Sequence, residues 1–195
     1  PVLDHGDSII YDLGREYVGL ITLEAQGEGT VNVSYGECLK DNNVKRTPDW
    51  HDFSIDYVCS GEKSYTNYML RLACRYLQVS TQDSAKITKI GIVPQYFETK
   101  RKDFSFLSGI DAQIYEICAR TLELCMMEHY VDCPWREQCL YAFDSRNQML
   151  CGYYAFGEYQ AARASLELIA HGLREEGLLS LTYPAGFDLP IPSFS

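Results

Sequence analysis

The fold of the first half of the chain is decided by the stretch YVGLITLEAQGEGTVNVSYG, residues 17–36. Its first nine residues are mostly apolar, and residues 30–36 alternate polar and apolar side chains with the period of two of a half-buried strand. The link between these runs carries Gly27 and Gly29, and glycine accepts the positive φ angles of tight hairpins. The stretch therefore predicts two antiparallel strands joined by a turn.

Further strand-like runs follow, separated by short polar links. Residues 39–52 are rich in Asp, Asn and Lys and predict a long loop between two of the strands. Several short antiparallel strands at this spacing are typical of a β-sandwich of the jelly-roll type, which we predict for residues 1–106. The further runs are residues 53–59, 65–72, 75–81 and 87–97.

Beyond residue 106 the apolar residues recur with a helical period. Ser108 and Asp111 are typical of a helix N-terminus, with the serine as its cap. Apolar residues then recur at three- and four-residue intervals, which predicts a helix with one buried face. That predicted face consists of Ile114, Cys118, Thr121, Leu122 and Cys125.

Two more helices are predicted at residues 145–156 and 158–175. The second contains Ala161, Leu166, Ile169, Ala170 and Leu173 as apolar contacts, and Gly177 is a suitable stop. Three helices bury too little apolar surface to form a finished domain. We therefore expect residues 107–195 to be the beginning of a larger, helical domain.

The charge of the chain excludes some classes of partner. The net charge is −10, and residues 107–195 contain no lysine. An acidic chain without a basic stripe does not suit nucleic acid, whose binding requires neutralisation of phosphates. No apolar run approaches the roughly 18 residues of a membrane span. A neutral substrate such as a sugar suits this composition.

The eight cysteines and four histidines do not form a metal-binding pattern. There is no CxxC pair and no HExxH, so we expect neither a metal nor another cofactor. Free thiols in a chain of this length fit a reducing compartment. Together with the lack of a visible signal peptide, they favour a cytoplasmic location.

The densest polar cluster is residues 131–147, which contain three acids, two arginines and three aromatic residues. Sugar-cleaving sites combine carboxylates that move protons with aromatic faces that cover the ring. Pro134 interrupts a helix and places Asp132 and Glu137 on a loop or a single turn. The same composition is also typical of an ion-pair network at a helix end, so composition alone leaves both readings open.

Residues 132–137, DCPWRE, resemble the Asp-Cys-Pro-x-Arg-Glu motif of the α-L-rhamnosidases of glycoside hydrolase family 78. The next acid of the family comes twelve residues after the first aspartate, at Asp144, and Tyr141 occupies a tryptophan position. Residues 12–16, 33–37 and 178–195 also resemble the family. The resemblance implies an α+β multidomain chain, in which an antiparallel β-sandwich precedes the first helices of an (α/α)6 barrel.

The resemblance further implies an inverting glycoside hydrolase that cleaves terminal α-L-rhamnosyl residues. Glu137 would be the general acid that protonates the departing glycosidic oxygen. The general base of the family is a glutamate much later in the barrel, so we expect this chain to be incomplete and inactive by itself. Arg136 would orient a carboxylate or a hydroxyl. The residues implied to bind the sugar are Asp132, Trp135, Arg136, Tyr141 and Asp144.

Residues 140–143 depart from the family, because Leu-Tyr-Ala-Phe replaces Gly-Trp-Thr-Gly. The bulkier turn would reshape the sugar subsite, so the substrate is rhamnose or a similar neutral sugar. The alternative function is a non-catalytic carbohydrate-binding module. The acidic cluster favours the hydrolase, since binding sandwiches usually carry their sugar contacts on the β part.

Overall fold

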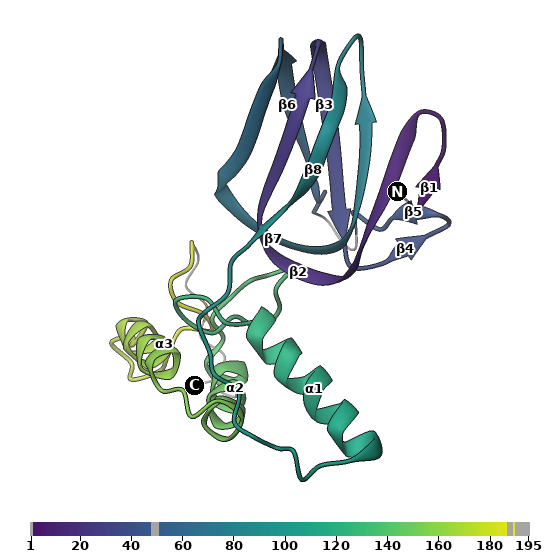
Figure 1. Ribbon diagram of the computed structural model, residues 1–195. Helices are drawn as coiled ribbons and strands as arrows, with labels where there is room; N and C mark the ends of the chain where they lie inside the picture. The colour runs from purple at the N-terminus through teal and green to yellow at the C-terminus, as the bar shows by residue number, and fades with distance from the viewer. Residues whose placement is uncertain (1, 48–50, 187–188, 190–195) are drawn as a thin grey trace. The chain divides into compact units, whose positions relative to one another are not determined.

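The computed structural model describes residues 2–47, 51–186 and 189. It divides the chain into two compact units, one ending at Gln95 and one beginning at Tyr96 (Figure 1). The first unit contains the strands and the second contains three helices. The predicted fold class, an antiparallel β domain followed by helices, is therefore confirmed.

The first unit is built on one antiparallel sheet of six strands. Its order is β1-β2-β7-β3-β6, and β8 pairs with residues 19–26 of β2. The 19-residue strands β2 and β7 are paired with register shifts that mark bulges, and bulges bend a strand. Figure 1 shows both strands curving along their length. The strands are β1 (Leu3–Asp4), β2 (Ser8–Gln26), β3 (Glu28–Gly36), β6 (Ser54–Ser60), β7 (Lys63–Thr81) and β8 (Lys86–Pro94).

The core of this unit comes from β3 and from continuous buried runs in the long strands, residues 18–21 of β2 and residues 72–74 of β7. In β3 the buried residues include Val31, Val33 and Tyr35, as the period of two predicts. The predicted turn is also present, because β2 ends at Gln26, β3 begins at Glu28, and Gly27 has a φ of +88°. The two strands do not pair with each other as the predicted hairpin requires, because β7 lies between them in the sheet and pairs with both. Local sequence therefore determined the two strands and the turn, but not their partners.

Two further strand predictions needed correction. Residues 65–72 and 75–81 are not separate strands, because Ala73 and Cys74 continue the pairing of β7 with β2 and are fully buried. The predicted loop at residues 39–52 contains a hairpin, formed by β4 (Leu39–Lys40) and β5 (Asn43–Val44). Asp41 and Asn42 at its turn have φ of 51° and 60°, the conformation that a two-residue hairpin turn requires.

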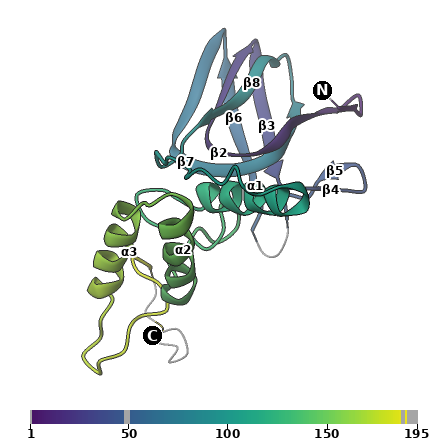
Figure 2. The same cartoon turned by 60° about the horizontal axis from the view of Figure 1, so that its bottom comes forward.

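The second unit contains α1 (Gly109–Leu124), α2 (Ala142–Ala155) and α3 (Gln160–His171), of which α2 and α3 pack against each other (Figure 2). The carboxylate of Glu158 caps α3 by accepting the backbone N–H groups of Gln160 and Ala161. Within the described residues, no helix is long and apolar enough to cross a membrane. The core consists of Ala119, Leu122, Met126, Tyr130, Leu140, Met149, Phe156, Ala161 and Ala162.

The predicted first helix is present, but its cap and its buried face differ from the prediction. The side chain of Ser108 precedes α1 without forming a capping hydrogen bond. Leu122 and Cys125 are buried as predicted, whereas Ile114 and Cys118 are exposed. Because α1 has apolar residues on more than one side, its sequence does not determine which side meets the core.

The predicted second and third helices were also placed imperfectly. α2 begins at Ala142, three residues before the predicted start, and α3 ends at His171, four residues before the predicted end at residue 175. Leu166 and Leu173, two of the predicted contacts of α3, are exposed. The helix ends where Gly172 caps it, and Leu173 then pairs in a bridge with Leu179. The predicted family-like residues 190–194 lie outside the described residues.

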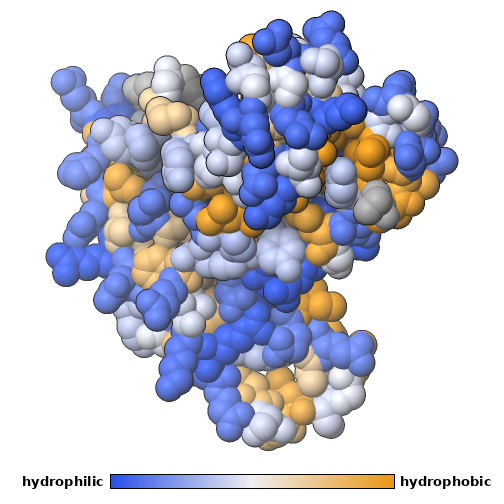
Figure 3. Space-filling model, turned by 45° about the horizontal axis from the view of Figure 1, so that its top comes forward, coloured by the Kyte–Doolittle hydropathy of each residue, from blue (hydrophilic) through white to orange (hydrophobic). Residues whose placement is uncertain are grey.

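Large apolar side chains remain on the surface of both units. β7 exposes Tyr68 and Met69, and α1 exposes Ile110 and Ile117. Figure 3 shows such hydrophobic patches on a face that is otherwise mostly hydrophilic. The three helices therefore leave part of their apolar surface uncovered, as the sequence predicted.

A buried tyrosine next to a helix glycine allows a test of the helical core. Tyr130 is fully buried, and its hydroxyl has no hydrogen-bond partner among the described residues. A Cβ added at Gly152 in α2 would overlap that hydroxyl and have its next neighbour at 3.6 Å. We expect Gly152→Ala to lower the free energy of unfolding by about 1–3 kcal/mol through overpacking.

In a Tyr130→Phe background the same substitution should have the opposite effect. The clash is then removed, and alanine is favoured over glycine in a helix by about 1 kcal/mol. Urea unfolding of the four variants, followed by circular dichroism, measures this coupling. An equal cost of Gly152→Ala in both backgrounds would show that the hydroxyl is not the obstacle.

Candidate active site

The loop between α1 and α2 is held by backbone hydrogen bonds at its start. The N–H of Val131 donates to the carbonyl of Cys125 at 2.9 Å, and the N–H of Asp132 donates to the carbonyl of Cys139 at 2.9 Å. Pro134 and Trp135 are buried, so the middle of the loop is anchored as well. The polar side chains of residues 132–137 are thereby held by a fixed backbone.

Asp132 is a half-buried carboxylate at the entry of this loop. One of its oxygens accepts the backbone N–H of Cys139 at 2.8 Å. Burial raises the pKa of Asp132, and the nearby charge of Glu137 adds to this effect. The hydrogen bonds from Cys139 and Cys133 act in the opposite direction without cancelling the rise. Asp132 therefore holds a proton more readily than an ordinary aspartate.

The pKa of Glu137 is shifted in the opposite direction to that of Asp132. Arg136 donates two parallel hydrogen bonds to its carboxylate, from Nε to Oε2 at 3.0 Å and from Nη2 to Oε1 at 2.9 Å. Burial acts to raise the pKa of Glu137, but Arg136 and the Cys133 thiol together hold it below its ordinary value. In this arrangement Glu137 is ionised at neutral pH.

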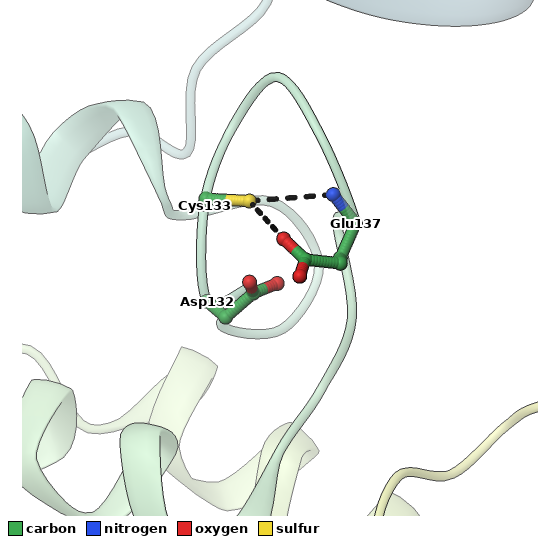
Figure 4. A group of neighbouring side chains, drawn as sticks. All are labelled: Asp132, Cys133 and Glu137. Carbon is green, nitrogen blue, oxygen red and sulfur yellow. Dashed lines mark hydrogen bonds between the residues drawn. The ribbon is translucent and has the colours of Figure 1, made fainter. Parts of the chain in front are cut away.

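The two carboxylates and a thiol converge inside the loop (Figure 4). One oxygen of Asp132, one oxygen of Glu137 and the sulfur of Cys133 all lie within 4.8 Å of one another. Neighbouring carboxylates whose pKa values are pushed apart are typical of sites that divide acid and base roles. The loop can therefore exchange a proton between its own groups.

The same three atoms have a spacing that a metal ion could use. Metal binding by the sulfur requires the thiolate, and burial raises the pKa of Cys133 to about 12. Glu137 is in addition already neutralised by Arg136. The chemistry of the group therefore favours proton transfer over metal binding.

The remaining predicted site residues lie around this group. Trp135 is only 8% exposed, so its ring is largely covered. Tyr141 is half-buried, precedes α2 and pairs in an isolated bridge with Thr182. Burial, and then the neighbouring Cys139, raise the pKa of its hydroxyl. Asp144 lies in the first turn of α2. Among the described residues, it is not part of the group formed by Asp132, Cys133 and Glu137.

Cysteines are the contacts that sequence reasoning missed. Cys133 bonds the side chain and the backbone of Glu137, and the N–H of Cys139 bonds Asp132. The spacing of four residues between Cys133 and Glu137 is a signal that could have indicated the first pair, because such residues meet on one turn.

Two family models match the chain almost end to end. The bacterial α-L-rhamnosidase concanavalin-like domain matches residues 4–94, and the bacterial α-L-rhamnosidase six-hairpin glycosidase domain matches residues 106–193. The first match covers the sheet, and the second contains the loop with Asp132 and Glu137. A search of curated proteins found no match.

Solved structures of rhamnosidases share the fold. A family 78 rhamnosidase from Bacillus sp. GL1 has 28% identity and a TM-score of 0.83 over 100% of this chain and 21% of its own. A Klebsiella oxytoca rhamnosidase solved with rhamnose bound has 22% identity and a TM-score of 0.72, covering 97% of this chain and 41% of its own. A Streptomyces avermitilis α-L-rhamnosidase complexed with L-rhamnose has 16% identity and a TM-score of 0.72, covering 94% of this chain and 19% of its own.

The chain therefore spans about a fifth of the length of the Bacillus and Streptomyces enzymes and two fifths of the Klebsiella enzyme. The two matched domains follow each other in the order of the strand and helix units. With both domain models matched and the fold shared along the whole chain, this protein belongs to the bacterial α-L-rhamnosidase family of glycoside hydrolases.

Proposed function

We propose that this chain supplies the general acid of an inverting glycoside hydrolase that removes terminal α-L-rhamnosyl residues, with Glu137 as the acid. The observation that carries the proposal is the convergence of Glu137 and Asp132 in a loop that belongs to the matched glycosidase domain. A carboxyl that can donate a proton to the departing oxygen is one half of the usual machinery of glycoside hydrolysis, and Asp132 acts on the charge of that carboxyl.

A general acid must carry a proton, but Arg136 lowers the pKa of Glu137 as long as the two side chains are hydrogen-bonded. Burial is the largest influence on the pKa of Glu137, and it acts upward. When Arg136 turns away, two of the influences that lower the pKa are removed, so the pKa of Glu137 should rise, which is the direction that an acid needs. We propose that a sugar hydroxyl, binding to Arg136, drives this exchange.

The general base is a different group from Asp132. Inversion leaves room for a water molecule between two carboxyls that are typically some 6.5–9.5 Å apart. The carboxylates of Asp132 and Glu137 approach within 4.8 Å, which is too close for that water. We propose that the base lies outside these 195 residues. This agrees with the comparison in which the chain matches only 21% of the length of the Bacillus enzyme. The chain alone would then be inactive.

The sugar-binding role falls to the residues around the acid. Asp132, with its raised pKa, can donate to or accept from a ring hydroxyl, and Asp144 lies nearby in sequence at the start of α2. Tyr141 and Trp135 are proposed to line the subsite. Two relatives were solved with rhamnose bound, which supports rhamnose as the substrate of this chain.

Hydrolysis of an aryl α-L-rhamnoside by this chain, and by any longer natural form of the protein that contains it, tests the proposal. We expect turnover only in a longer form, called the active form below, and inversion at the anomeric carbon by nuclear magnetic resonance. Aryl glycosides of other neutral sugars serve as controls for specificity. Rhamnose binding without turnover in every form would favour the carbohydrate-binding module instead.

A further inference from the structure

We propose that Cys133 is a positioning residue for Glu137, whose thiol fixes the carboxyl and leaves Oε1 as the oxygen that carries the transferable proton. This inference rests on the proposed role of Glu137 as the acid. It concerns how the chain itself prepares that acid before any substrate binds.

The sulfur of Cys133 holds Glu137 at two points. The thiol donates to Oε2 with a sulfur–oxygen distance of 3.1 Å, and the backbone N–H of Glu137 donates to the sulfur at 3.3 Å. Figure 4 shows both contacts closing across the loop. In a regular helical turn that N–H would meet the carbonyl four residues earlier, so here the sulfur takes the place of the carbonyl. One atom therefore fixes both the backbone and the side chain of Glu137.

The thiol can act as a donor because it stays protonated. Burial raises the pKa of Cys133 to about 12, and its hydrogen bonds to Glu137 and Asp132 also raise it. A thiolate would instead repel the carboxylate and could not donate to it. At neutral pH the contact is therefore a hydrogen bond from S–H to a carboxylate oxygen.

The two oxygens of Glu137 are held unequally. Oε2 accepts from both Cys133 and Nε of Arg136, whereas Oε1 accepts from Nη2 of Arg136. When Arg136 turns away, Oε2 keeps the Cys133 donor and Oε1 loses its guanidinium donor. Oε1 then faces the side chain of Asp132, which also hydrogen-bonds Glu137 (Figure 4). A proton added to the carboxyl then favours Oε1, because a protonated Oε2 would be a weaker acceptor for the Cys133 thiol.

Replacing the thiol should change both the rate and its pH dependence. The donated hydrogen bond favours the ionised carboxylate, so its loss raises the pKa of Glu137. In the active form we expect Cys133→Ala to lower kcat on poor leaving groups about tenfold, with little change in KM, because the acid is less well oriented. The basic limb of the pH profile should move to higher pH.

Cys133→Ser provides the decisive comparison, since a hydroxyl can make both hydrogen bonds. We expect it to keep most of the kcat and the wild-type basic limb. Cys118→Ala, an exposed cysteine on α1, is the matched control and should behave as wild type. Thermal unfolding of each variant separates loss of structure from loss of positioning.

The outcomes separate this inference from the proposed function. An active wild type with an inactive Glu137→Gln variant establishes the acid, whatever Cys133 does. Given that result, an unchanged kcat and basic limb in Cys133→Ala would overturn the positioning role. Equal losses in the alanine and serine variants, without a shift of the basic limb, would also overturn it. If the alanine variant fails to fold, the serine variant decides. Retention of the wild-type kcat and basic limb in Cys133→Ser supports the positioning role, and loss of either overturns it.

Discussion

Glu137→Gln in the active form is expected to lower kcat/KM about 10²- to 10⁴-fold on rhamnosides with poor leaving groups. The amide cannot supply the proton that a departing sugar or alcohol oxygen needs. On activated aryl rhamnosides, whose leaving groups depart without protonation, the loss should be much smaller. Steady-state kinetics on a series of leaving groups with graded pKa values measures the difference.

A matched control for this substitution is Glu128→Gln, which makes the same chemical change at an exposed position between α1 and the loop. It should leave both classes of substrate unaffected. Equal, mild losses on poor and activated leaving groups in Glu137→Gln would contradict the acid role. The residue would then only support the loop, through its pairing with Arg136.

Gly19→Ala is expected to destabilise the strand unit strongly. A Cβ at Gly19 would overlap the backbone carbonyl of Val93 and lie 2.9 Å from the Cα of Pro94, both on β8. Backbone atoms of a paired strand cannot move aside as a flexible side chain can, so β2 and β8 must separate. We expect the free energy of unfolding to fall by about 3 kcal/mol. Urea unfolding followed by circular dichroism in the strand region measures it.

Gly91→Ala is the control within the same pair of strands. Gly91 lies on β8 opposite Thr22 of β2, and a Cβ there would meet nothing within 4 Å. This variant should be as stable as the wild type or slightly more so, because alanine has less freedom in the unfolded chain. Similar losses in both variants would mean that glycine itself, and not the close approach of Val93, is needed in these strands.

The sequence predicted best where the determining interactions are local. The two strands and the glycine turn at residues 17–36 follow from local properties of the sequence, whereas their pairing with β7 instead of with each other does not. The meeting of Asp132 and Glu137 could be anticipated too, because Pro134 bends six consecutive residues into one loop. The family motif then connected this loop with a known chemistry.

Sequence reasoning was less successful where packing decides. The buried side of α1 was wrong in part, since Ile114 and Cys118 are as suited to a core as Leu122 is, yet only Leu122 meets the neighbouring helices. The continuous strand β7 was divided in two because the pairing that joins its halves comes from β2, some 55 residues earlier in the chain. Interactions between distant segments leave no short-range pattern.

The sequence by itself determined the order of the two domains, the two strands and turn of residues 17–36, and the set of acids in the loop. Only the tertiary structure decided which acid holds its proton. Burial raises the pKa of Asp132, while Arg136 and Cys133 lower that of Glu137 against the same influence. The physical reason is that a residue's identity fixes only its ordinary pKa, whereas desolvation and hydrogen bonds depend on the folded surroundings.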